Sequence, residues 1–133
     1  MNKYSSHCDE FYVNMHLNTE MDLPQNRESV LHFFEQLQKR FPKMTNFYTR
    51  ERGEFSLEEE KESGKYRWVA TELRRLCSGA VNPESIASAI EQHQTVLDIV
   101  PYELSVSYLD CESLNLTMGF DYSYRGNHNE LLA

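Results

Sequence analysis

The side chains best suited to proton transfer in this sequence are His16 and Glu72, because an imidazole and a carboxylate can exchange a proton near neutral pH. Each lies in a stretch that favours a β-strand. If the two strands belong to one sheet and both side chains reach the same face, a pocket around them would suit a small-molecule site or an enzyme. Because no further motif supports that chemistry, we assign no catalytic residue.

The three cysteines do not form a metal or disulfide pattern. Cys8, Cys77 and Cys111 are odd in number and lack C-x-x-C spacing, which indicates free thiols in a reducing, cytoplasmic compartment. Adjacent side chains in the segment 7–10 (HCDE) diverge, so they cannot all bind one ion. The glycines are isolated, and no phosphate-binding loop is present. We therefore expect neither a metal nor a cofactor.

Length and charge restrict the class of protein. The 133 residues suit one domain, and 26% of them are charged. The formal net charge of −8 opposes binding to nucleic acid or to an anionic membrane. Neither a membrane-spanning apolar run nor a secretory signal is expected. We predict a single α+β domain over 1–133, with a loose arm at 1–9 and the start of a truncated helix at 126–133.

Alternation of apolar and polar residues over 11–21 predicts a strand with one face on a core. Asn26 then has the side chain of a helix N-cap, and an apolar stripe from Val30 to Phe41 follows at helical spacing. Pro42 is expected to end this helix.

Two segments 56 residues apart share five residue types: 26–36 (NRESVLHFFEQ) and 82–92 (NPESIASAIEQ). Since Asn caps a helix and Glu favours its first turn, both segments predict helix starts in equivalent halves of one fold. In the second segment Asn82 would be the cap and Pro83 the first helical residue. The correspondence pairs Leu37 with His93, which we expect to be a hydrogen-bonded core or rim residue.

The remaining chain predicts further strands. Residues 45–60 read as extended with a turn near Gly53, and 65–76 as a strand with a helix as the alternative. The second helix would end at Pro101, and 103–110 and 113–124 would form a hairpin. The order β-α-β-β-α-β-β predicts a ferredoxin-like antiparallel sheet with two helices on one face and an extra C-terminal strand. Its first and third strands would be central.

In that fold no helix covers the second face of the sheet. Exposed aromatic side chains there without catalytic companions favour a non-catalytic association domain. The contact would be self-association into a homo-oligomer, or packing of a C-terminal region. The residues predicted to form this open-face binding site are Tyr12, Asn14, His16, Trp68 and Glu72.

A weaker alternative concerns single-stranded RNA. The segments 10–17 (EFYVNMHL) and 64–71 (GKYRWVAT) resemble the two aromatic motifs of the RNA-recognition motif. The resemblance implies that Tyr12, Tyr66 and Trp68 stack on bases. The segments depart from the motifs in the inverted Gly64-Lys65 pair and in Arg67, and the acidic charge makes nucleic acid an unfavourable partner.

Overall fold

An antiparallel sheet of six strands and two helices make up the computed structural model, which describes residues 8–24, 26–51, 53–104 and 111–122. The strands follow the spatial order β2-β3-β4-β5-β1-β6, and each neighbouring pair is antiparallel. The elements are β1 (Cys8–Thr19), α2 (Arg27–Arg40), β2 (Asn46–Thr49), β3 (Phe55–Glu58), β4 (Tyr66–Thr71), β5 (Arg75–Val81), α3 (Ile86–Glu103) and β6 (Cys111–Tyr122).

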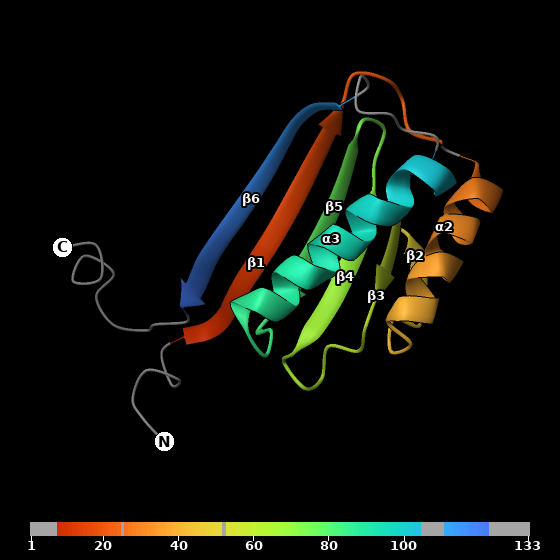
Figure 1. Ribbon diagram of the computed structural model, residues 1–133. Helices are drawn as coiled ribbons and strands as arrows, with labels where there is room; N and C mark the ends of the chain where they lie inside the picture. The colour runs from red at the N-terminus through yellow and green to blue at the C-terminus, as the bar shows by residue number, and fades with distance from the viewer. Residues whose placement is uncertain (1–7, 25, 52, 105–110, 123–133) are drawn as a thin grey trace.

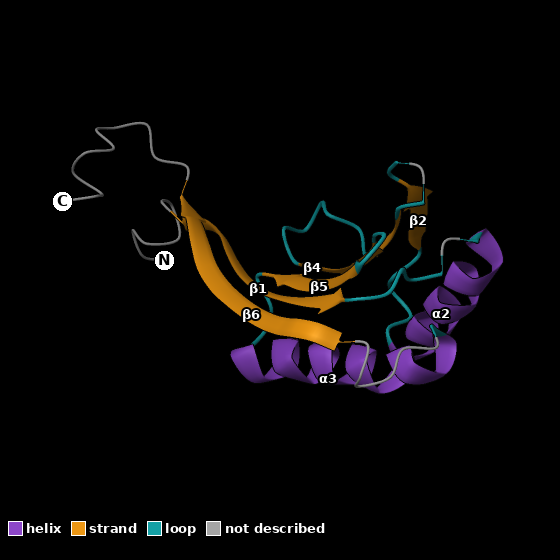
Figure 2. Cartoon of the chain, turned by 90° about the horizontal axis from the view of Figure 1, so that it is seen from above, coloured by secondary structure: helices purple, strands orange, loops and turns teal. Residues whose placement is uncertain are grey.

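Both helices lie on one side of the sheet, where α3 crosses the middle strands and α2 lies near β2 (Figure 1). Viewed from above, the sheet curves so that the start of β1 and the strand β2 both rise away from the helices (Figure 2). The side without helices, which we call the open face, is therefore the concave one. Alternation along each strand decides which side chains reach it.

The apolar core lies between the sheet and the helices. Val13, Met15 and Leu17 of β1 are at most 4% exposed, and Phe33 and Leu37 of α2 are fully buried. The intervening residues of β1 consequently point to the open face. The confirmed parts of the prediction are the α+β class, the antiparallel sheet and the two helices.

The helix α2 agrees with its prediction. The Asn26 side chain accepts a hydrogen bond from the backbone N–H of Ser29 at 2.7 Å, and the helix ends at Arg40 with Phe41 as its C-cap. Lys39 and Arg40 occupy the last turn, where positive charge is favourable at the helix C-terminus.

The ferredoxin-like strand order is wrong, because residues 46–81 form four strands instead of two. Gly53 and Gly64 adopt φ values of 79° and 77°, which lets the chain reverse from β2 to β3 and from β3 to β4. A third reversal over 72–74 separates β4 from β5, and it contains neither Gly nor Pro. As a result β5 and β6 flank β1, and the strand that carries Trp68 is one place further away.

The start of α3 also differs from the prediction. Its N-cap is Ser85, whose side chain accepts from the backbone N–H of Ser88 at 3.0 Å. Asn82 instead has a positive φ of 49°, and its side chain joins the backbone of Phe11 to that of Gly64. The helix starts therefore lie three residues out of step with the repeat.

The C-terminal elements are only partly as predicted. Pro101 lies inside α3 rather than at its end, and Leu104 is a buried C-cap instead of a strand residue. Cys111, expected in a turn, begins β6, which pairs with β1. Residues 105–110 of the strand expected at 103–110, and the helix start expected at 126–133, lie outside the described residues. β1 begins at Cys8, within the stretch expected to be a loose arm.

Candidate functional site

The open face is built on β1 and its two neighbours. Tyr12, Asn14, His16 and Asn18 alternate with the buried residues of β1 and are all partly exposed there. Their partners across the sheet are Val81, Gly79, Cys77 and Arg75 on β5, and Gly119, Thr117, Asn115 and Ser113 on β6. This surface contains many hydrogen-bonding groups and few charges.

Trp68 of β4 belongs to the open face, because the neighbouring Val69 is buried in the core. Trp68 pairs with Gly79, and a Cβ atom added to that glycine would collide with the indole ring. The ring therefore lies directly against the backbone of β5 at Gly79. Tyr12 lies in the same way over Gly119 of β6. The two glycines thus allow both aromatic rings to rest against the sheet.

Asn14 lies on β1 between these two aromatic contacts, opposite Gly79 and Thr117. Its side-chain oxygen is buried and has no hydrogen-bond partner among the described residues. A buried carbonyl oxygen without a donor is unfavourable in free energy. Binding of a donor on this face, after a small shift of the neighbouring side chains, would remove that cost.

The structure places His16 against Cys77, with 3.1 Å between Nδ1 and Sγ. Such a pair resembles a nucleophile and its base, but the thiol is 3% exposed. Burial raises the pKa of Cys77 to about 11; nearby Arg75 acts in the opposite direction without cancelling this effect. Cys77 is therefore a protonated thiol at neutral pH, and the pair lacks an activated nucleophile.

Glu72 lies in the turn between β4 and β5, where it contacts arginine rather than His16. Its Oε1 accepts hydrogen bonds from Nε and Nη2 of Arg75 at 3.0 and 2.8 Å, and Arg50 lies 3.8 Å from its Oε2. The two residues of the predicted proton-transfer pair thus have different partners. Glu72 fixes the guanidinium group of Arg75 beside the turn.

A polar cluster on the open face was not predicted from the sequence. Tyr48 of β2 donates a short hydrogen bond to Glu58 of β3, and Lys61 contacts the same carboxylate at 3.2 Å. The carboxylate hydrogen bond raises the pKa of Tyr48 and also that of Lys61. Glu58, expected in an exposed acidic turn, is only 7% exposed and lies opposite Trp68.

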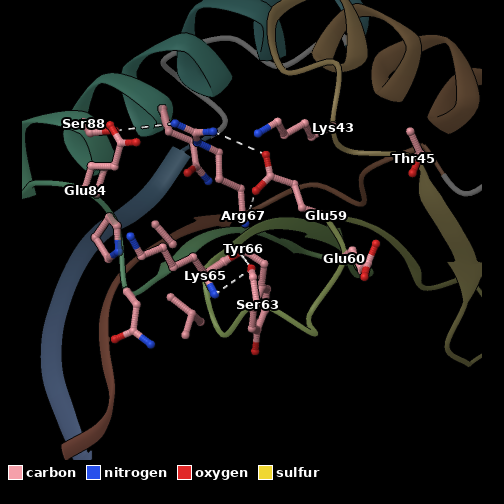
Figure 3. A pocket seen from close by; sticks show the side chains of 16 residues that line it. Lys43, Thr45, Glu59, Glu60, Ser63, Lys65, Tyr66, Arg67, Glu84 and Ser88 are labelled. Carbon is pink, nitrogen blue, oxygen red and sulfur yellow. Dashed lines mark hydrogen bonds and ion pairs between the residues drawn. The ribbon is translucent and has the colours of Figure 1, made fainter. Parts of the chain in front are cut away.

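A separate cavity of about 560 Å³ lies where the loop 59–65 meets β4 and the segment leading into α3 (Figure 3). Arg67 extends from β4 and contacts Glu59 at 3.3 Å and Ser88 at 3.5 Å. Its guanidinium also lies 5.0 Å from the centre of the Phe41 ring. The lining includes three cations and three carboxylates, which are Lys43, Lys65, Arg67, Glu59, Glu60 and Glu84.

The cavity differs in place from the pocket expected around His16 and Glu72, since neither residue lines it. From the sequence, Arg67 is assigned no role in a site. Its position next to Trp68 contained a usable signal, because alternation turns Arg67 toward the helices, where a cation needs a partner. That partner is Glu59.

Comparison of the chain with protein-family models, with curated proteins and with solved structures found no match. Among the described residues, no group of three or more His, Cys, Asp or Glu side chains is arranged to hold a metal ion. No helix in the described part of the chain has the length and apolar character needed to cross a membrane. The function is therefore inferred from the surfaces of the molecule.

Proposed function

We propose that this protein is a non-catalytic association domain that binds a segment of another polypeptide on its open face. The observation that carries this proposal is the pair of aromatic rings, Trp68 and Tyr12, which lie against the sheet backbone at Gly79 and Gly119. They give a partner an apolar surface without projecting side chains, and such aromatic residues are enriched at protein contacts.

The shape of the open face favours a rod-like occupant such as a helix. Two concave faces would touch each other mainly at their rims, so a second copy is a poor fit here (Figure 2). A helix is about 10 Å across and can enter a curved sheet with one side. Because the chain has a net charge of −8, a basic amphipathic helix is favoured electrostatically.

The chain contains one tryptophan, Trp68, so its fluorescence reports directly on the open face. Titration with a synthetic amphipathic Leu/Lys peptide is expected to give a saturable blue shift of the Trp68 emission, because an apolar helix would exclude water from the indole. The Tyr12→Lys variant should bind the peptide with a dissociation constant at least tenfold higher.

Leu73→Lys is the matched control, since it adds the same charge at a residue that is 48% exposed in the turn at 72–74. An unchanged Trp68 emission at peptide saturation, or equal weakening by both variants, would contradict the proposal. Quenching by single-stranded RNA at low salt, without any response to the peptide, would support the RNA-binding alternative instead.

A second candidate is a small-molecule site in the cavity beside Arg67, whose volume lies within the usual range for small ligands. Its mixed cations and carboxylates suit a zwitterion such as an amino acid. A rise in the thermal midpoint with an amino-acid mixture, lost in Lys43→Met, would favour this function.

An enzymatic role for His16 has less support, because the Cys77 thiol beside it is protonated. A cytoplasmic location belongs to the proposal and agrees with a reduced Cys77.

A further inference from the structure

The most exposed apolar side chains of the described strands lie on β6, on the side that faces the helices. Leu114, Leu116 and Met118 are 55%, 50% and 52% exposed. They pair with Leu17, Met15 and Val13 of β1, all of which are buried in the core. The helix α3 crosses the sheet over the strands next to β6 and leaves β6 itself at the outer edge (Figure 1). The apolar face of the sheet therefore extends onto β6, beyond the strands that α3 covers.

The outer edge of β6 is also unprotected against strand pairing. Within the described residues β6 pairs with β1 alone, so one row of its backbone groups has no strand partner. Its sequence, CESLNLTMGFDY, contains no Pro, Lys or Arg, and residues 113–120 carry no charge. Irregularities in its pairing with β1 occur only near the strand ends. Natural edge strands normally contain a charge, a proline or a bulge that prevents further pairing.

We infer that β6 pairs antiparallel with β6 of a second copy of this chain, around a two-fold axis at Leu116. In this register Leu114 of each copy lies opposite Met118 of the other, so the two apolar stripes form one continuous surface. On the open face Asn115 lies opposite Thr117, and their side chains can form hydrogen bonds. The pairing adds six strands to six and keeps the whole sheet antiparallel.

The distribution of charge favours a second copy. Two chains of net charge −8 repel each other, and most of their surface cannot meet without placing carboxylates together. In the register centred on Leu116, no acidic residue of β6 lies directly opposite another, since Glu112 lies opposite position 120 and Asp121 opposite position 111. Residues 113–119 carry no charge, so two antiparallel copies of this segment place only uncharged residues opposite each other.

This inference does not depend on the proposed function of the open face, because the β6 edge and the aromatic rings are different surfaces. A dimer formed through β6 would nevertheless bring two open faces next to each other in one larger sheet. The peptide titration of Trp68 therefore tests the open face, and the mass of the particle tests β6.

The experiment is light scattering across a range of protein concentrations. The parent chain is expected to have the mass of two copies at high concentration, and Leu116→Lys the mass of one. Lysine at an exposed edge position keeps the fold and opposes pairing by charge at the two-fold axis. Leu73→Lys is the matched control and should remain dimeric. Circular dichroism and the thermal midpoint check that each variant is folded.

Amide hydrogen exchange is the second measurement. In the parent chain at high concentration the outward amides of residues 113–119 should be protected, and Leu116→Lys should lose that protection while β5 keeps its own. A single-chain mass at every concentration would overturn the inference. A dimer that survives Leu116→Lys but is lost in Trp68→Lys would also overturn it and would place the contact on the open face.

Discussion

At the scale of single residues, the environment of Cys77 decides whether the open face can perform nucleophilic chemistry. Arg75 and His16 are the kinds of neighbour that activate a thiol, but the burial of Cys77 opposes ionisation more strongly. Glu72 adds to this effect by raising the pKa further. The side chains of a catalytic pair are thus present without the electrostatics that such a pair needs.

We predict that Cys77 in the folded protein resists alkylation by iodoacetamide at pH 7.5. Its pKa of about 11 leaves only a minute thiolate fraction, and the side chain is 3% exposed. Peptide mapping by mass spectrometry should find modification in urea but little without it. His16→Ala should leave the native rate low. Rapid native labelling that depends on His16 would instead indicate an activated pair and favour an enzyme.

His93, on α3, is a buried hydrogen-bonded residue, as expected from the sequence. Its Nε2 lies 3.1 Å from the carbonyl oxygen of Val13, so this nitrogen carries the proton. Ser78 accepts a hydrogen bond from Gln92 and lies 2.9 Å from Nδ1 of His93, to which its hydroxyl can donate. Both ring nitrogens are therefore satisfied in the neutral form.

This arrangement predicts a pH dependence of stability. Burial lowers the pKa of His93 below 6.5, so the unfolded chain takes up a proton at a higher pH than the folded one. The stabilisation by neutral His93 is complete above pH 6.5 and decreases as the pH falls toward the lowered pKa. Urea denaturation should show that the free energy of unfolding falls less between pH 7.5 and pH 5 in His93→Gln than in the parent chain.

At the scale of elements, the turns determined how far the fold could be predicted from the sequence. The helix α2 was predictable because its cap, its stripe and its final proline all agree. The region 66–81 was not, because the reversal at 72–74 uses Glu72, Leu73 and Arg74, none of which is a typical turn residue. Backbone hydrogen bonds from Glu72 to Arg75 and from Leu23 to Leu73 hold it instead.

The same turn limited the prediction of the site. Alternation along β1 was sufficient to place Tyr12, Asn14 and His16 on one face. The face of Cys77 depends on where β5 starts, and one residue more or less in the turn would exchange its two faces. The contact between His16 and Cys77 is therefore tertiary information, which the local pattern did not contain.

The two residues at the start of α3 should differ in their contribution to stability. Ser85→Ala removes an N-cap and should lower the free energy of unfolding by about 1 kcal/mol, as should Asn26→Ala at α2. Asn82→Ala should cost more, about 2–3 kcal/mol. It loses hydrogen bonds to Phe11 and Gly64 and leaves alanine at a positive φ.

Urea denaturation measures all three variants. If Ser85→Ala left the free energy of unfolding unchanged, and Asn82→Ala lowered it as much as Asn26→Ala does, then Asn82 rather than Ser85 would be the N-cap of α3. Asn82→Gly separates the two contributions at that position, because glycine accepts the positive φ but cannot replace the side-chain hydrogen bonds. The free energy of unfolding of Asn82→Gly should lie between those of the parent chain and Asn82→Ala.

At the scale of the whole molecule, acidity acts in opposite directions on the two proposed contacts. A basic helix on the open face is attracted by the charge of −8, whereas two copies that meet along β6 repel each other. Both effects are screened by salt, since the Debye length falls from about 30 Å at 0.01 M to about 8 Å at 0.15 M ionic strength.

Added salt should therefore weaken the binding of the peptide to the open face and strengthen the association of the two copies through β6. We expect the peptide dissociation constant, from Trp68 emission, to rise between 0.01 and 0.15 M ionic strength (about the range of those screening lengths). The dimer dissociation constant, from light scattering, should fall over the same range. Leu116→Lys should stay monomeric throughout while its peptide response follows that of the parent. If salt dissociated the dimer, ion pairs rather than the neutral centre of β6 would hold the copies together, and the register around Leu116 would be wrong.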